Sequence, residues 1–257
     1  MQATVIESVE QLTRAVLELF DSTETRWWFR GQRKDWPLLP KVKRGYSKEE
    51  KFLTNLFYAR ARTRYRLCPD DKDYGGWLAV MQHYGLPTRL LDWTHSPLVA
   101  AYFATKYPYD SGDTAERTDA VIWALEPHNV NESQGYERIF PPLNAESLED
   151  LIRPAFKGQD TSKIQVLAAS PLETDLKMLT QQGAFTVHVL DGPLNEVPGC
   201  EDWLKKFLIP AQRVGEVASE LDVLGFRLAD LFPDLENLAQ EVTNRFRPPS
   251  SSVGGLA

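Results

Sequence analysis

Apolar residues recur at helical spacing near the start of the chain. In residues 5–20 (VIESVEQLTRAVLELF) they return every three or four positions, which predicts an amphipathic helix. A second helix is expected to begin at Ser47, because Ser47 and Glu50 form the Ser-x-x-Glu pattern of a capping box. This helix is expected to run to about Arg66, with arginines along the face opposite its apolar one.

Two further helices are predicted from the residues that begin or end them. The segment 76–85 (GWLAVMQHYG) stops at Gly85, a residue that commonly follows the last turn of a helix. Ser96 followed by Pro97 is a frequent N-cap and first-turn pair, so a helix is expected over residues 97–106.

The C-terminal part of the chain is also predicted to be helical. Residues 211–226 form one amphipathic segment that Gly225 ends, and residues 233–246 form another that Asp234 caps. The last residues, 247–257 (RPPSSSVGGLA), are rich in proline, serine and glycine and are expected to be a flexible tail.

The strand candidates lie mostly in the middle of the chain. Residues 119–127, 163–170 and 183–190 are rich in β-branched and aromatic residues, and RWWFRG (26–31) reads as a short buried strand that Gly31 ends. Helices come first and strands later, which favours an α+β fold in one domain with a mostly antiparallel sheet.

The composition is that of an ordinary globular protein. The 257 residues are 42% hydrophobic and 25% charged. Cys68 and Cys200 lie far apart, and the N-terminus lacks the basic and apolar regions of a secretion signal, so a cytoplasmic location is expected. No apolar run reaches the length of a membrane span, so we expect no contact with a membrane.

The net charge of −7 conceals a basic segment. Residues 26–66 hold thirteen lysines and arginines but only three acidic residues. Such a segment is either a solvated surface or an electropositive wall that receives an anionic ligand. A dinucleotide and a nucleic acid would both suit such a wall.

The signatures of several common enzyme classes are missing from the sequence. The chain has no GxxxxGK[ST], GxGxxG, GxSxG or HExxH pattern, and its four histidines have no zinc-ligand spacing, so no metal site is expected from them. A metal-dependent nuclease could use Asp70 and Asp175 to hold Mg²⁺, with Lys177 beside the attacking hydroxide. That remains a third hypothesis for the function.

Four motifs together resemble the FRG domain family, which is named for its Phe-Arg-Gly sequence. They are FRGQ (29–32), QHYGLPTRLLDWTHSPLVAAYFA (82–104), QQGAF (181–185) and LFPDL (231–235). On this resemblance the chain divides into an N-terminal helix (1–25), an FRG domain (26–246) and the tail.

The order of these motifs is also similar to that of ADP-ribosyltransferases of the Arg-Ser-Glu type. In that resemblance Arg30 stands for the strand-end arginine, Thr94 and Ser96 for the hydroxyl motif before a helix, and Gln182 for the position of the catalytic glutamate. It implies an ADP-ribosyltransferase-like fold with a split sheet, in which Arg30 pairs with the pyrophosphate of NAD. The glutamate itself is absent, which implies slow catalysis or another acid.

The same resemblance suggests which neighbours contact NAD. Gly31 would let the ligand approach the backbone closely, and Gln32 would recognise an amide. His83 and Tyr102 are further candidates, the latter for stacking on nicotinamide, although packing roles suit both residues as well.

Arg89 and Asp92 are expected to form a structural ion pair that fixes the loop before the hydroxyl motif. The leading hypothesis for the function is thus a protein that binds NAD as a substrate and transfers ADP-ribose to a macromolecular acceptor, or hydrolyses NAD, as a toxin or phage-defence effector. The alternative is a non-enzymatic module that binds nucleic acid or a protein through the basic segment 26–66.

Overall fold

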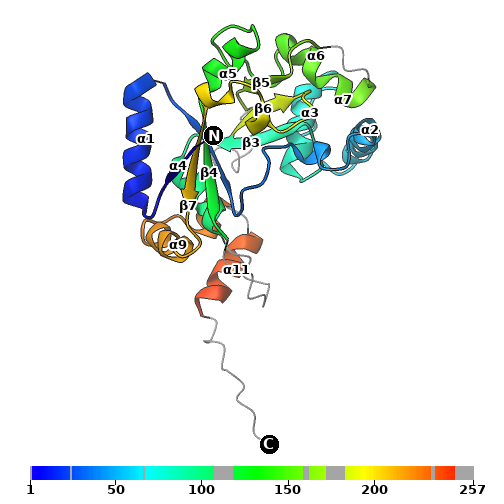
Figure 1. The fold of residues 1–257 in the computed structure, drawn as a ribbon. Helices are drawn as coiled ribbons and strands as arrows, with labels where there is room; N and C mark the ends of the chain where they lie inside the picture. The colour runs from blue at the N-terminus through cyan, green and yellow to red at the C-terminus, as the bar shows by residue number, and fades with distance from the viewer. Residues whose placement is uncertain are drawn as a thin grey trace, which may run out of the picture.

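The sheet at the centre of the molecule is open and mostly antiparallel (Figure 1). The structure is a computed structural model that describes residues 2–23, 25–65, 67–106, 118–158, 162–171, 183–232 and 235–246. The seven strands lie in the order β1-β7-β4-β2-β3-β6-β5, and only β1 and β7 run parallel. Their bounds are β1 Ala3–Val5, β2 Trp28–Gln32, β3 Leu90–Thr94, β4 Ala120–Leu125, β5 Val166–Ala169, β6 Gly183–His188 and β7 Leu204–Ile209.

The sheet has two parts that meet at one point. Strand β2 pairs with β4 along its whole length, and β3 pairs with β6 along its whole length. Between β2 and β3, however, the one pair of partners is Phe29 and Thr94. The two strands therefore diverge beyond this pair and leave a wedge between the two parts of the sheet.

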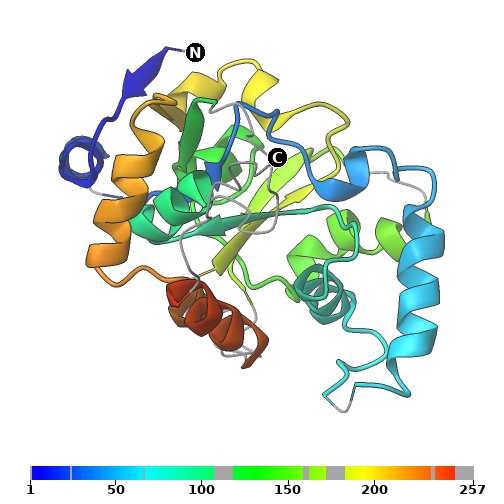
Figure 2. The same cartoon turned by 90° about the horizontal axis from the view of Figure 1, so that it is seen from below.

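Each part of the sheet has its own group of helices. Helices α1, α4 and α9 lie beside β4 and β7, whereas α2, α3, α6 and α7 lie beside β3 and β6 (Figures 1 and 2). The helix bounds are α1 Val9–Thr23, α2 Glu50–Ala61, α3 Tyr74–His83, α4 Pro97–Thr105, α5 Pro127–Ser133, α6 Glu149–Ile152, α7 Pro154–Lys157, α9 Val214–Val223, α10 Leu228–Leu231 and α11 Leu235–Arg245. Within the described residues, no helix is long and apolar enough to cross a membrane.

The alternation of side chains along the strands separates the hydrophobic cores. In β2, Phe29 packs with α1, α4 and α9, while its neighbour Trp28 points to the opposite face with Trp93 and Trp123. Leu90 in β3 packs with α3, α6 and α7 in a separate cluster. The two helix groups thus bury different cores, and the wedge lies where those cores meet.

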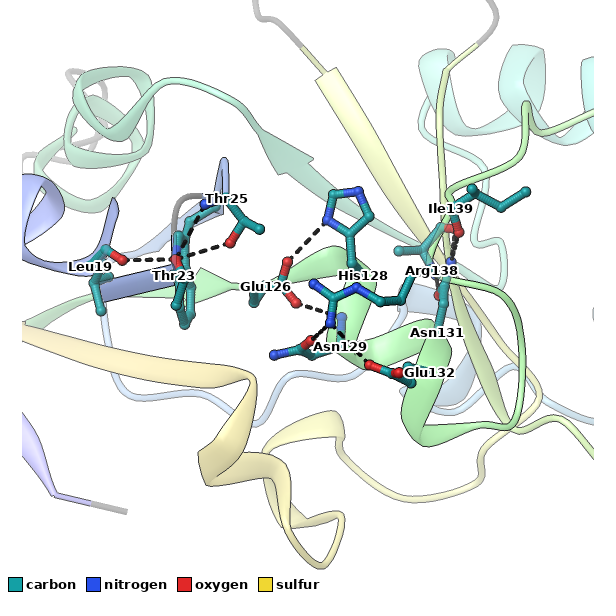
Figure 3. Close-up of polar contacts among 12 residues, drawn as sticks. Leu19, Thr23, Thr25, Glu126, His128, Asn129, Asn131, Glu132, Arg138 and Ile139 are labelled. Carbon is teal, nitrogen blue, oxygen red and sulfur yellow. Dashed lines mark hydrogen bonds and ion pairs between the residues drawn. The ribbon is translucent and has the colours of Figure 1, made fainter. Parts of the chain in front are cut away.

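Glu126 directly follows β4 and is the N-cap of helix α5 (Figure 3). This buried carboxylate caps α5, since it accepts hydrogen bonds from the backbone N–H of Asn129 and from Nδ1 of His128 at 3.0 Å. One turn later, Nδ2 of Asn131 donates to the carbonyls of Ile139 and Ala168. These contacts hold the connection after β4 in place.

The predicted elements agree with the structure in kind, and the differences have physical causes. Helix α2 begins at Glu50 and not at Ser47, because the Glu50 side chain pairs with Arg89 and does not complete a capping box. The helix ends at Ala61, and β2 continues through Gly31 to Gln32 because β4 pairs with it there.

Other differences lie at the ends of the chain and in two strands. Val5 belongs to the edge strand β1, while β3 and β7 were not predicted. Gly225 ends α9 with a positive φ, as predicted. Asp234 and the tail 247–257 lie outside the described residues.

Candidate functional site

A cavity of about 460 Å³ opens beside the wedge between β2 and β3. A volume of this size is within the range of small-molecule sites. The residues around it come from both parts of the sheet and from both groups of helices. They are Phe29, Arg30, Gly31, Gln32, Arg33, Trp36, Arg44, Ala79, Gln82, His83, Asp92, Trp93, Thr94, Phe103, Gly183, Ala184, Phe185 and Phe232.

Arg30 spans the wedge. Its Nη1 donates a 2.7 Å hydrogen bond to the backbone carbonyl of Asp92 on β3 and lies 3.8 Å from Asp92 Oδ2. Its Nε is buried and has no hydrogen-bond partner. Burial is the main cause that lowers the pKa of Arg30, and the Asp92 carboxylate opposes it. The guanidinium is thus held in place at one nitrogen and unsatisfied at another.

Asp92 is held by α3. Nε2 of Gln82 donates to both carboxylate oxygens of Asp92 at 2.8 Å, and the Thr88 hydroxyl donates to Oε1 of Gln82 at 2.5 Å. The Asp92 side chain is nevertheless 55% exposed. Its carboxylate therefore has a fixed orientation and remains open to the cavity.

The expected pair between Arg89 and Asp92 does not form. Arg89 is 1% exposed, and its Nε and Nη2 donate to the two carboxylate oxygens of Glu50 at 2.8 and 2.6 Å. Its Nη1 donates to the carbonyl of Leu151 at 2.6 Å. Arg89 directly precedes β3 and its side chain is buried against Glu50 and Leu151, whereas Asp92 lines the cavity. Arg89 is a structural residue that ties α2 and α6 to β3.

The hydroxyl motif is divided between the cavity and a helix cap. Thr94 is buried, lines the cavity and accepts a hydrogen bond from the backbone N–H of Ser96 at 3.2 Å. Ser96 is the N-cap of α4, because its Oγ accepts from the N–H of Val99 at 3.3 Å. The cap predicted from the sequence is confirmed, and Ser96 is not among the cavity-lining residues.

Gly31 and Gln32 line the cavity, but packing contacts already occupy them. A Cβ added to Gly31 would lie 1.8 Å from the carbonyl oxygen of Ala100 and 2.7 Å from the backbone nitrogen of Ala104. Glycine is therefore needed here for the close approach of α4 to β2, a reason that differs from the ligand contact that the sequence suggested. Gln32 is buried, and its Oε1 accepts from the indole N–H of Trp123 at 3.0 Å.

The remaining predicted residues lie in different places. His83 lines the cavity from the end of α3. Tyr102 is half-buried on α4, packs against the core of α1, α4 and α9, and is not among the cavity-lining residues. Gln182 lies outside the described residues, although Gly183, the next residue, lines the cavity and pairs with Thr94.

Sequence reasoning missed most of the cavity's rim. Arg33 and Arg44 are exposed, and neither forms an ion pair in the described part of the chain. Trp36, which is 41% exposed, lies with them, and Phe103 and Phe232 add two more rings. The basic segment, the motif at 82–104 and the LFPDL motif contain these residues, but no one of these patterns shows which of them share a cavity.

The structure also bears on the nuclease hypothesis. Asp175 and Lys177, two of the three residues proposed for it, lie outside the described residues. Among those that are described, no three histidines, cysteines or acidic residues are grouped as metal ligands.

The chain folds as a mixed α/β protein with an arginine-lined cavity beside the wedge of its sheet. The segment that builds β2, α2, α3, β3 and α4 is also the one a known family shares: residues 25–113 match the family model of the FRG domain. The chain therefore contains an FRG domain, as the FRGQ motif and the motif at 82–104 predicted. Searches of curated proteins and of solved structures each found no match.

Proposed function

We propose that the cavity binds NAD as a substrate, and that the protein transfers ADP-ribose to a macromolecular acceptor or to water. The observation that carries this proposal is the state of Arg30. Its guanidinium is partly desolvated in the wedge, and its buried Nε donor lacks a partner. An unsatisfied buried donor costs roughly 1–3 kcal/mol, a cost that a bound oxyanion would remove.

The surroundings of Arg30 suit a dinucleotide. Nη1 is fixed on β3, so the Nε and Nη2 edge is the side that remains for two parallel hydrogen bonds to a pyrophosphate. The cations of Arg33 and Arg44 lie on the same cavity and would attract the ligand's negative charge. Trp36, Phe103 and Phe232 supply apolar surface for its rings.

The positions of Arg30 and Thr94 support the ADP-ribosyltransferase-like layout that the sequence suggests. Arg30 is on a strand beside a wedge in the sheet, and Thr94 precedes helix α4 and lines the same cavity. In this layout Arg30 holds the pyrophosphate and Thr94 lies near the nicotinamide ribose. Such an activity would deplete the NAD of the cell or modify one of its macromolecules. Both effects are ways in which a toxin or phage-defence effector acts.

The test combines binding with turnover. The protein is incubated with NAD labelled on its adenylate and with cell lysate, and both labelled macromolecule and free nicotinamide are measured, while calorimetry measures NAD binding. Arg30→Met is expected to abolish binding, whereas Arg153→Met is expected to leave it unchanged, because Arg153 is an exposed arginine that pairs with Glu149 away from the cavity. Neither NAD binding nor nicotinamide release in the wild-type protein would refute the proposal.

A second candidate function is binding of single-stranded nucleic acid at the same rim. Arg33 and Arg44 with the exposed Trp36 combine positive charge with an aromatic ring, as such sites do. Its signature would be an affinity for RNA or DNA that falls steeply with salt, because neutralised phosphates release counterions. A shallow salt dependence, or no binding at low salt, would exclude this function.

A further inference from the structure

We propose that Asp92 is the carboxylate that completes this site, where it recognises the positively charged nicotinamide and stabilises the ribose cation as nicotinamide leaves. This inference rests on the proposed function and deepens it. It names the ligand class as oxidised nicotinamide dinucleotides, which carry a pyridinium cation besides their pyrophosphate. It also supplies the acid that the sequence lacks at Gln182.

The hydrogen bonds around Asp92 have a defined direction. The backbone N–H of Leu90 donates to the Thr88 hydroxyl at 3.1 Å, so this hydroxyl donates its own proton to Oε1 of Gln82. Because Oε1 accepts there, the amide nitrogen of Gln82 faces Asp92 and contacts both of its oxygens. Three residues of the QHYGLPTRLLD motif thus serve to aim one carboxylate.

The contacts with Gln82 and Arg30 leave the Asp92 carboxylate able to interact with a ligand. Gln82 is neutral, and the hydrogen bond of Arg30 goes to the backbone carbonyl of Asp92, while the nearest carboxylate oxygen is 3.8 Å away. An ionised carboxylate has about four acceptor positions, and the amide of Gln82 takes two of them. Asp92 can therefore accept ribose hydroxyls or face a cation in the cavity.

Arg30 and Asp92 together fit a ligand that carries both signs of charge. A pyrophosphate would bind the Nε and Nη2 edge of Arg30, and the pyridinium and its ribose would lie on the side of Asp92. Reduced NADH keeps the pyrophosphate but has no pyridinium charge, and a nucleic acid presents phosphates alone. The carboxylate therefore favours NAD over NADH and disfavours a simple polyanion.

The reaction step balances without a further reagent. The bond between ribose C1′ and the pyridinium nitrogen breaks, and nicotinamide leaves as a neutral molecule with the bonding electron pair. The positive charge passes to the ribose, where Asp92 stabilises it. Water or an acceptor hydroxyl then forms the new C1′–O bond, and its proton passes to Asp92 and on to solvent. No group is oxidised or reduced.

The test compares Asp92→Asn with Asp71→Asn in the full chain. Asp71 is an exposed aspartate that also pairs with an arginine, Arg62, but it does not line the cavity. Asp92→Asn keeps the shape and the contact with Gln82 while removing the charge. Loss of one such electrostatic stabiliser costs on the order of 10²–10³ in rate, so nicotinamide release is expected to fall by that factor. Asp71→Asn should release nicotinamide at the wild-type rate.

Binding separates recognition from turnover. Calorimetry with NAD and NADH is expected to show a preference for NAD on the order of tenfold in the wild-type protein, and this preference should disappear in Asp92→Asn. Gln82→Met keeps the charge of Asp92 but removes the amide that orients its carboxylate. This variant should have a lower turnover number and should largely keep the preference for NAD over NADH. Melting temperatures confirm that each variant is folded.

The outcomes distinguish this inference from the proposed function. If the wild-type protein releases nicotinamide and a folded Asp92→Asn variant releases it equally fast, Asp92 is not the carboxylate. Equal wild-type affinity for NAD and NADH overturns the recognition role. If the wild-type protein neither binds NAD nor releases nicotinamide, the proposed function itself fails and this inference with it.

Discussion

Replacing Arg89 with methionine should destabilise the protein strongly without removing any cavity-lining group. Arg89 and Glu50 are 1% and 7% exposed, and two short hydrogen bonds join their charged groups. Arg89→Met leaves the Glu50 carboxylate buried without its cation and takes the donor from the Leu151 carbonyl. Breaking a buried pair on one side costs roughly 3–5 kcal/mol. That is a large part of the 5–15 kcal/mol by which domains are typically stable.

The assay is equilibrium unfolding in urea, followed by tryptophan fluorescence. The double variant Arg89→Met with Glu50→Met is expected to be more stable than Arg89→Met alone, because two apolar residues leave no buried charge. Arg153→Met, at an exposed pair with Glu149, should change the midpoint little. An Arg89→Met protein of nearly wild-type stability would refute this account of the pair. A double variant whose loss of unfolding free energy equals the sum of the losses of the two single variants would refute it as well.

Three further predictions concern a histidine, a glycine and a glutamine. Burial lowers the pKa of His188 from 6.5 to about 3. Above pH 6.5 it is neutral in both states, and below this pH only the unfolded state binds its proton. The unfolding free energy should fall by about 1.4 kcal/mol per pH unit down to about pH 3, and His188→Asn should remove that slope in urea titrations at several pH values. Gly31→Ala should lower stability by about 1–3 kcal/mol, because its Cβ would meet the α4 backbone, whereas Gly192→Ala should melt like the wild type. Gln182→Glu should raise nicotinamide release more in the Asp92→Asn background than in the wild type; equal gains would show independent roles.

The sequence predicted the elements with strong local signals. The Ser96–Pro97 pair marked the start of α4, and Gly225 marked the end of α9, because a cap or a positive φ depends on one or two neighbouring residues. The FRGQ motif led to Arg30, and the cavity does lie beside it. Motif reasoning therefore identified a residue that lines the cavity.

Local patterns failed where a distant residue decided the outcome. The capping box at Ser47 does not form, since Arg89, which directly precedes β3, pairs with the carboxylate of Glu50. Strand β3 is buried at every position except Asp92, so its sequence shows no regular alternation of polar and apolar residues. The link between Gln82 and Asp92 joins a helix to a strand and exists only after packing.

Arg30 lies on the central strand β2 and Arg89 directly precedes the central strand β3, yet the two arginines have different surroundings. Arg89 pairs its charge with the buried carboxylate of Glu50, whereas Arg30 leaves a buried donor unsatisfied and donates a hydrogen bond to a backbone carbonyl. A residue kept for stability would not retain an unsatisfied donor, so its cost is better explained by a ligand. Arg30→Met, which keeps the apolar stem and removes the desolvated charge, is therefore expected to melt at the wild-type temperature or above it while losing NAD binding in calorimetry. A loss of unfolding free energy as large as that of Arg89→Met would show instead that Arg30 is a structural residue that holds β2 and β3 together.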